Sequence, residues 1–155
     1  MKKIGFVGVG IMGKSMVRNL MKAGFEVSIY TRTRSKVEDV IGEGAIWCDS
    51  VAECAKGRDA VISIVGYPKD VIEVYFGPAG ILANADPGTY VIDMTTTSPK
   101  LAVQIFDEAE KLGLHAIDAP VTGGDSGAKA GTLTILAGGK IRKKEAEKKD
   151  KAAEV

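Results

Sequence analysis

Ile4-Gly5-Phe6-Val7-Gly8-Val9-Gly10-Ile11-Met12-Gly13 is the stretch that decides the fold of this 155-residue chain. The apolar run before Gly8 predicts a short strand, and the residues after Gly13 carry a helical pattern. Between them stands G-x-G-x-x-G, in which Gly8 makes the tight turn out of the strand. Gly10 lets a pyrophosphate approach the backbone, and Gly13 lets the helix pack closely on the strand. A merely structural turn is the alternative, but the position between a strand and a helix favours dinucleotide binding.

The helix after this glycine loop is expected to supply an anion site. The free N–H groups at its start and the positive end of its dipole attract a phosphate. Apolar side chains recur at helical spacing up to Met21, and Gly24 is expected to end the helix. We therefore expect five residues of the loop to bind the cofactor: Gly8, Gly10, Ile11, Met12 and Gly13.

The end of the second predicted strand, residues 26–30, indicates which dinucleotide is bound. In an NAD-binding unit an Asp or Glu stands there and holds the ribose 2′-hydroxyl. This sequence has Thr31-Arg32-Thr33 and no acid. Arg can pair with a 2′-phosphate through a bidentate fork, and Thr can donate hydrogen bonds to it. We expect Thr31, Arg32 and Thr33 to favour NADP (NADPH) over NAD; an ordinary basic loop before a helix is the other interpretation.

The rest of the chain alternates between strand and helix patterns. The run at 59–65 is almost continuously apolar, as in a parallel sheet that is covered on both faces. The alternation predicts an α/β fold of the Rossmann type with a doubly wound, mostly parallel sheet. Further strands are expected at 45–47, 90–94, 114–117 and 132–136, with helices at 35–43, from Ser50 to Gly57, up to Tyr75, and from Pro99 to Gly113.

The composition changes after Gly139. Residues 140–155 are mostly Lys, Glu and Ala, with almost no large apolar side chains. We therefore expect residues 1–139 to form a single dinucleotide-binding domain and 140–155 to be a charged tail, either helical or frayed.

Charge and composition limit the classes of partner. The 21 basic and 20 acidic residues nearly cancel, so bulk charge indicates neither a nucleic acid nor a membrane surface. The predicted strand begins directly after Lys3, so we expect no signal peptide and a cytoplasmic protein. Cys48 and Cys54 are then expected to be buried or idle thiols, and His115 to be structural. No catalytic residue and no metal site are predicted.

Four separated segments carry a family pattern: Gly8 to Leu20, Tyr30 to Thr33, Asp93 to Pro99, and Asp118 to Leu133. Together they resemble the β-hydroxyacid dehydrogenase family, which includes 3-hydroxyisobutyrate dehydrogenase and the tartronate semialdehyde and glyoxylate/succinic semialdehyde reductases. The resemblance covers Lys3 to about Gly139. It implies an NAD(P)-dependent oxidoreductase acting on a small carboxylate-bearing substrate.

The resemblance also implies roles for residues outside the glycine loop. Val65 and Gly66 would lie beside the cofactor ribose, where the family usually has Leu-Pro, and Thr96 near the nicotinamide. Thr122-Gly123-Gly124 would bind the substrate carboxylate, although a flexible turn is the alternative for this segment. Lys129 would stand in a non-catalytic loop.

The sequence departs from the family pattern at the catalytic lysine. The family's catalytic lysine lies in a second, helical domain, within a glycine-rich motif that residues 140–155 do not reproduce. Hydride transfer to a carbonyl needs a general acid, and this chain offers no evident one. If that domain is absent, an exposed apolar face is expected to make the chain self-associate.

Three alternatives therefore stay open. The chain could be a catalytically silent NADP-binding module, or a protein whose basic tail recruits a partner. The third is an enzyme like the decarboxylating 6-phosphogluconate dehydrogenase, although that family usually has Gly-Gly-Asn-Ser where this chain has Met94-Thr95-Thr96-Thr97.

Overall fold

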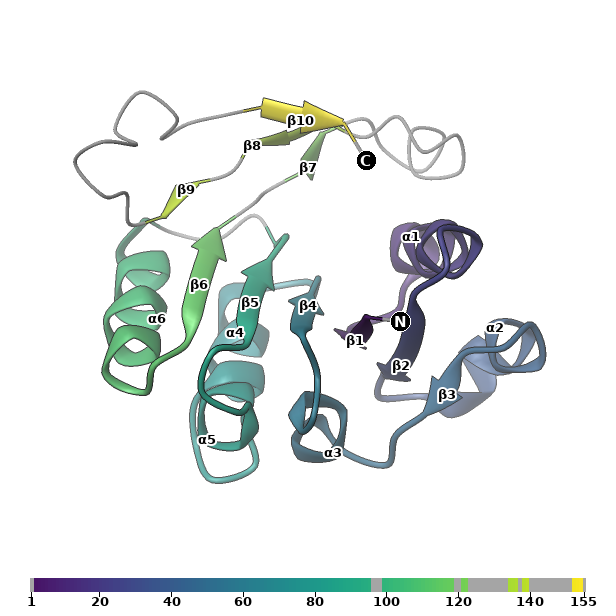
Figure 1. The fold of residues 1–155 in the computed structure, drawn as a ribbon, viewed down its shortest axis with the longest axis horizontal. Helices are drawn as coiled ribbons and strands as arrows, with labels where there is room; N and C mark the ends of the chain where they lie inside the picture. The colour runs from purple at the N-terminus through teal and green to yellow at the C-terminus, as the bar shows by residue number, and fades with distance from the viewer. Residues whose placement is uncertain are drawn as a thin grey trace.

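A seven-stranded sheet forms the centre of the computed structural model, which describes residues 2–95, 99–118, 121–122, 134–136, 138–139 and 152–154. The strand order is β3-β2-β1-β4-β5-β6-β9 (Figure 1). The first six of these strands run parallel, and β9 pairs antiparallel with β6. The strands are β1 Lys3–Val7, β2 Glu26–Tyr30, β3 Ile46–Trp47, β4 Ala60–Ser63, β5 Tyr90–Asp93, β6 His115–Asp118 and β9 Gly138–Gly139. This order confirms the predicted Rossmann-type α/β fold.

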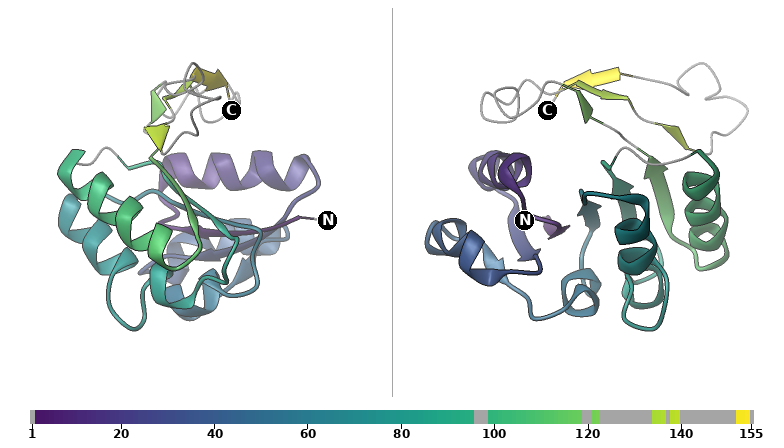
Figure 2. Two further views of the ribbon diagram at one scale, coloured as in Figure 1. Left: turned by 60° about the vertical axis from the view of Figure 1, so that its left-hand side comes forward. Right: turned by 180° about the vertical axis from the view of Figure 1, so that it is seen from behind.

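Helices cover both faces of this sheet (Figure 2). One face packs against α1 and the segment formed by η1 and α2, and the other against α3 to α6. The helices are α1 Ile11–Lys22, η1 Arg34–Val37, α2 Glu38–Gly42, α3 Val51–Ala55, α4 Pro68–Tyr75, α5 Ile81–Asn84 and α6 Pro99–Lys111. Because β1 to β6 are parallel, their carboxyl ends all lie at the same edge of the sheet, where ligands of such sheets bind.

Alternation along β1 explains why two separate cores form. Phe6 points to the α1 side and packs with Met16 and Val17, whereas Val7 points to the opposite side and packs with Tyr75. Every second side chain of a strand faces the same way, so a strand covered on both sides needs apolar residues throughout. Burying such side chains stabilises the fold by roughly 1.5–3 kcal/mol each.

The helix caps follow the sequence signals. Ser50 Oγ accepts a hydrogen bond from the Glu53 N–H at 3.1 Å, which caps α3. Gly24 follows the C-cap residue of α1 with a φ of +96°, so it ends that helix as predicted.

Some boundaries differ from the sequence predictions. The segment predicted as a strand over 59–65 is strand only from Ala60 to Ser63, and the predicted helix at 35–43 begins with the 3₁₀ turn η1. The helix α5 was not predicted, since Gly77-Pro78-Ala79-Gly80 indicates only a break.

A small second sheet has the order β10-β8-β7 and is antiparallel. Its strands are β7 Val121–Thr122, β8 Thr134–Leu136 and β10 Ala152–Glu154. Within the predicted tail 140–155, the described residues are those of β10, which pairs with β8. The domain boundary after residue 139 stays a prediction.

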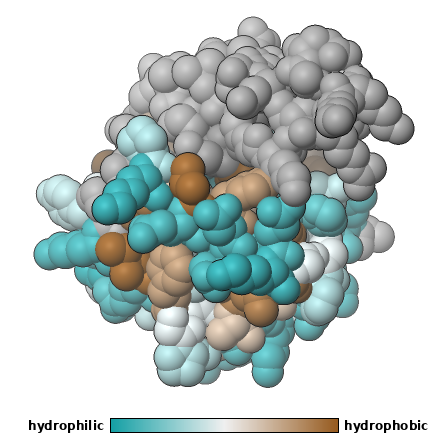
Figure 3. All heavy atoms as spheres, turned by 90° about the vertical axis from the view of Figure 1, so that its left-hand side faces the viewer, coloured by the Kyte–Doolittle hydropathy of each residue, from teal (hydrophilic) through white to brown (hydrophobic). Residues whose placement is uncertain are grey.

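The described surface in Figure 3 is mostly hydrophilic, with hydrophobic patches between the polar side chains. Val103 and Leu112, at 57% and 46% exposed, are among the large apolar side chains that face solvent. Self-association through an apolar face stays a prediction. In the part of the chain that the structure describes, no helix is both long and apolar enough to cross a membrane.

Candidate functional site

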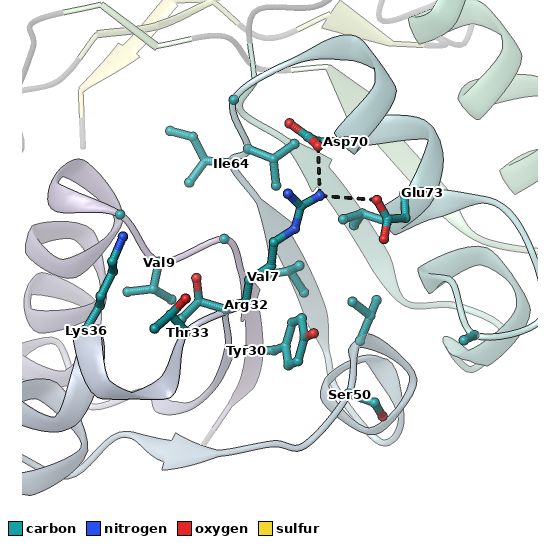
Figure 4. A pocket seen from close by; sticks show the side chains of 18 of the residues that line it. Val7, Val9, Tyr30, Arg32, Thr33, Lys36, Ser50, Ile64, Asp70 and Glu73 are labelled. Carbon is teal, nitrogen blue, oxygen red and sulfur yellow. Dashed lines mark hydrogen bonds and ion pairs between the residues drawn. The ribbon is translucent and has the colours of Figure 1, made fainter.

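A cleft of about 690 Å³ lies at the carboxyl ends of β1, β2 and β4 (Figure 4). The glycine loop forms one side of it, and the residues after β2 and β4 form the others. Three residues of α4 also line the cleft: Asp70, Glu73 and Val74. Seven of the predicted cofactor-binding residues come together here: Gly8, Gly10, Thr31, Arg32, Thr33, Val65 and Gly66.

The three glycines of the loop differ in what surrounds them. Gly8 has a φ of +89°, and a Cβ there would overlap the carbonyl oxygen of Ile64, so a side chain is excluded. A Cβ at Gly13 would lie 3.0 Å from the Gly8 oxygen and 3.3 Å from the Phe6 ring. Gly8 therefore makes the turn, and Gly13 allows α1 to pack closely on β1, as predicted from the sequence.

Gly10 has no such structural requirement. A Cβ at Gly10 would have no heavy atom within 4 Å, and its φ of −89° is open to any residue. Gly10 is also the N-cap residue of α1, and the first turn of this helix contains no acidic residue. Space, free N–H groups and a positive helix end are therefore combined at this point, which fits the pyrophosphate of a dinucleotide.

The end of β2 carries the predicted basic group. Arg32 extends into the cleft toward α4, and its Nη2 lies 2.8 Å from Oδ1 of Asp70 and 3.2 Å from Oε2 of Glu73 (Figure 4). The hydrogen bond to Asp70 raises the pKa of the Arg32 guanidinium, so this group stays charged. Arg34, two residues on, has its guanidinium carbon 5.6 Å from the centre of the Trp47 ring and a salt bridge to Glu38 at 3.5 Å. Of these two arginines, only Arg32 lines the cleft.

Four charged residues that the sequence did not single out also line the cleft. Lys36 adds a positive charge on η1, whereas Asp49, Asp70 and Glu73 add three carboxylates. Asp70 is the most firmly held of these, because its side chain is only 11% exposed and its Oδ2 accepts a hydrogen bond from the Tyr67 N–H at 3.1 Å. From the sequence, Asp70 could be recognised as an acidic residue in the first turn of a helix, where it is favoured by the helix dipole. No local sequence pattern indicates that it contacts Arg32.

The loop after β4 is fixed to the end of β5. The N–H of Val65 donates a 2.9 Å hydrogen bond to the Thr95 hydroxyl, and Thr95 is 3% exposed. This bond sets the position of Val65 and Gly66 at the edge of the cleft, where the family resemblance implies the cofactor ribose.

A buried carboxyl group lies behind this loop. Asp93 Oδ1 accepts hydrogen bonds from the Thr95 N–H at 3.0 Å and from the Ser63 hydroxyl at 3.2 Å. Ser63 also shares a hydrogen bond with the Tyr75 hydroxyl. Among the described residues, Oδ2 of Asp93 has no hydrogen-bond partner. Burial raises the pKa of Asp93, because the charged form is poorly solvated there.

The other predicted site residues fall into two groups. Ile11, Met12 and Gly13 form the first turn of α1, next to the cleft but not among the residues that line it. Thr122 lies in β7, and the rest lie outside the described residues: Thr96, Gly123 and Gly124. Lys129, which was not predicted to be a site residue, also lies outside them.

Cys48 and Cys54 are free and buried, in agreement with the prediction of buried thiols. Arg58 Nη2 lies 3.8 Å from Sγ of Cys48. The hydrogen bond from Cys54 lowers the pKa of Cys48 to about 7, and the same interaction raises that of Cys54. In the described ranges, no three His, Cys, Asp or Glu side chains are arranged to hold a metal ion.

Comparison with known proteins relates this chain to dehydrogenases. A family model described as the NAD binding domain of 6-phosphogluconate dehydrogenase matches residues 3–149. An uncharacterized oxidoreductase, YkwC, of Bacillus subtilis is 52% identical over 89% of this chain and 48% of its own length. The NAD-dependent L-serine dehydrogenase of Pseudomonas aeruginosa is 40% identical over 90% of this chain and 47% of its own length.

A solved structure shows the same relationship. The 3-hydroxyisobutyrate dehydrogenase of Mycobacterium tuberculosis, solved with L-serine, superposes with a TM-score of 0.84 at 33% identity. The match covers 90% of this chain and 47% of that one. The chain thus spans about half the length of the curated relatives it matches. With nearly all of its residues inside the family model, the chain belongs to the NAD-binding domain family of 6-phosphogluconate dehydrogenase and the β-hydroxyacid dehydrogenases.

Proposed function

We propose that this chain is the NADP-binding domain of an oxidoreductase that interconverts a small 3-hydroxy acid and its semialdehyde. The observation that carries the cofactor preference is Arg32, a cation in the cleft at the strand end where NAD-binding units have an acid. A guanidinium there pairs with a 2′-phosphate, whereas a carboxylate repels it. Thr31 and Thr33 flank Arg32 in the lining of the cleft and supply hydroxyl groups.

The glycine loop supports binding of the pyrophosphate. Open space above Gly10 and the uncapped first turn of α1 suit an anion. A nicotinamide dinucleotide supplies a hydride acceptor or donor when it is bound. The described residues contribute binding and orientation: the loop at Gly10 holds the phosphates, and Val65 and Gly66 border the ribose.

The family by itself does not select between NADP and NAD. The L-serine dehydrogenase relative is named as NAD-dependent. The preference for NADP therefore rests on residues 31–33 of this chain and on the absence of an acid among them.

The substrate class follows from the relatives. 3-Hydroxyisobutyrate and L-serine, in the names of two of them, are both small carboxylic acids with a hydroxyl on carbon 3. Thr122, Gly123 and Gly124 are the residues that we propose bind such a carboxylate, and Thr96 is proposed to lie near the nicotinamide. Turnover belongs to the whole enzyme, whose relatives are about twice as long as this chain.

Replacing one arginine at a time tests the cofactor proposal. Arg32→Ala removes the proposed charge-assisted hydrogen bonds to the 2′-phosphate, so NADPH should bind about tenfold to a hundredfold more weakly. NADH, which lacks the 2′-phosphate, should lose little affinity. Arg34→Ala is the matched control, because Arg34 packs over Trp47 outside the cleft. Isothermal titration calorimetry measures the dissociation constants of both nucleotides for the wild type and the two variants. Equal losses for the two nucleotides, or an equal effect of Arg34→Ala, would contradict the proposal.

A further inference from the structure

Two carboxylates form ion pairs with Arg32, the cation that is proposed to bind the 2′-phosphate. Asp70 and Glu73 lie one turn apart on α4, and both contact the same nitrogen, Nη2 of Arg32, at 2.8 and 3.2 Å (Figure 4). Thirty-eight and forty-one residues separate them from Arg32 along the chain. They therefore meet the arginine only because β2 and α4 border the same cleft.

The charge balance of the cleft makes this contact significant. The described lining contains two cations, Arg32 and Lys36, and three carboxylates, so its formal charge is −1. A 2′-phosphate brings about two further negative charges at neutral pH. To bind Arg32, the phosphate must displace the carboxylates of Asp70 and Glu73 from the guanidinium. It then remains close to both carboxylates, and like charges at short range repel.

The two acids are not equivalent. Asp70 is 11% exposed and also accepts a hydrogen bond from the Tyr67 N–H at the start of α4, so it helps to form the helix. Glu73 is 73% exposed and has only the Arg32 contact among the interactions described for it. A substitution at Glu73 should therefore leave α4 undisturbed and change only the environment of Arg32.

We propose that Glu73 is a specificity-determining residue that competes with the 2′-phosphate for Arg32 and so lowers the preference of this chain for NADPH over NADH. The inference rests on the proposed NADP-binding function. In the free chain Arg32 is held against α4, and in the bound chain it exchanges the Glu73 carboxylate for phosphate oxygens. NADH gains nothing from this exchange, because its ribose carries a hydroxyl at that position.

Glu73→Gln tests the competition directly. The exposed ion pair is weak, so its loss should tighten NADPH binding only about twofold to fivefold. NADH affinity should stay constant. The gain should shrink as salt is raised from about 0.01 to 1 M, since solvent-exposed charges are screened over that range. Glu108→Gln is the matched control: it makes the same charge change on α6, where Glu108 pairs with Lys111 and does not line the cleft.

Each outcome decides between the two proposals. A wild-type chain that binds NADPH and a Glu73→Gln variant with an unchanged ratio of NADPH to NADH affinity would overturn the competition alone. Weaker NADPH binding by Glu73→Gln would also overturn it, because Glu73 would then be orienting Arg32 for the phosphate. If the wild-type chain binds neither nucleotide, the proposed function fails, and the competition fails with it.

Discussion

The hydroxyl oxygen of Thr95 lies 2.9 Å from the backbone nitrogen of Val65 and accepts its hydrogen bond. This contact joins the residues after β4 to the residues after β5, two neighbouring parallel strands. Because Thr95 is buried and also donates its own N–H to Asp93, one side chain fixes the geometry of two loops beside the cleft.

Thr95→Val should show how much the hydrogen bond to Val65, as distinct from the volume of the side chain, contributes to stability. Valine keeps the volume but leaves the Val65 N–H without its acceptor, so the free energy of unfolding should fall by roughly 1–3 kcal/mol. Thr95→Ser keeps the hydroxyl and is the control. Urea unfolding followed by circular dichroism measures both; an unchanged midpoint for Thr95→Val would show that the bond is unimportant.

Adding one methyl group should mainly lower the stability of the fold at Gly8 and mainly weaken NADPH binding at Gly10. Gly8→Ala places a Cβ on the Ile64 carbonyl at a positive φ, so it should lower the free energy of unfolding by at least about 1–2 kcal/mol. Gly10→Ala meets open space, so it should cost only the difference between Gly and Ala at an N-cap, roughly 0.5–1 kcal/mol. Gly10→Ala should instead weaken NADPH binding, because the methyl group occupies the proposed pyrophosphate position.

Thermal unfolding and calorimetric titration of both glycine variants check this prediction. A Gly10→Ala variant that is destabilised as strongly as Gly8→Ala would contradict the open space at Gly10, and one that binds NADPH like the wild type would contradict the assignment of Gly10 to the pyrophosphate.

Asp93 should make the protein less stable as the pH rises. Its pKa is raised in the folded chain, so between the unfolded and folded values the folded state holds more protons than the unfolded state. The free energy of unfolding contributed by this group is therefore complete below the unfolded pKa and is lost as the pH rises through the folded pKa. Asp93→Asn retains the acceptor for Thr95 and Ser63 but cannot ionise, so its stability should fall less between acidic and neutral pH.

Urea unfolding of the wild type and Asp93→Asn at a series of pH values measures this difference. Asp39 and Glu43 work in the opposite direction in both proteins, because hydrogen bonds from Lys14 and from Arg18 lower the pKa values of these two carboxyls. Parallel stability curves for the two proteins would mean that Asp93 does not titrate differently on folding.

Burial should protect both cysteines despite the lowered pKa of Cys48. Cys48 and Cys54 are 1% and 0% exposed, so a thiol reagent needs local or global unfolding to reach either sulfur. We expect almost no reaction with Ellman's reagent in the native protein and two thiols per chain in urea. Rapid release of one equivalent from the native protein would show that the region around Cys48 opens.

The fold could be predicted from the sequence because its signals are local. The strand, turn and helix around Gly8 to Gly13 are set by glycine geometry and apolar periodicity within a dozen residues, and the structure has them where they were predicted. The strand β10 is the opposite case. Its Ala-Ala-Glu sequence has a low tendency to form strands, and the strand is set by its pairing with β8 rather than by a local pattern.

The candidate site could be predicted only in part for a related reason. Residues that follow a strand, such as Arg32 after β2, were expected at the carboxyl edge of the sheet, and Arg32 does line the cleft. The sequence does not reveal that Arg34 turns toward Trp47 or that Asp70 and Glu73 face Arg32. Those contacts depend on how α4 packs beside β2, which no local pattern encodes.

The most direct test of the account is a parallel titration of the wild-type chain with NADPH and with NADH, read by calorimetry and by thermal unfolding. A ligand that binds only the folded state stabilises it by about 2.7 kcal/mol when its free concentration is a hundredfold above its dissociation constant. We predict a clear rise in the unfolding temperature with NADPH and a smaller one with NADH at the same concentration. A larger rise with NADH would contradict the assignment of Arg32 to a 2′-phosphate, and no rise with either nucleotide would contradict dinucleotide binding by this chain.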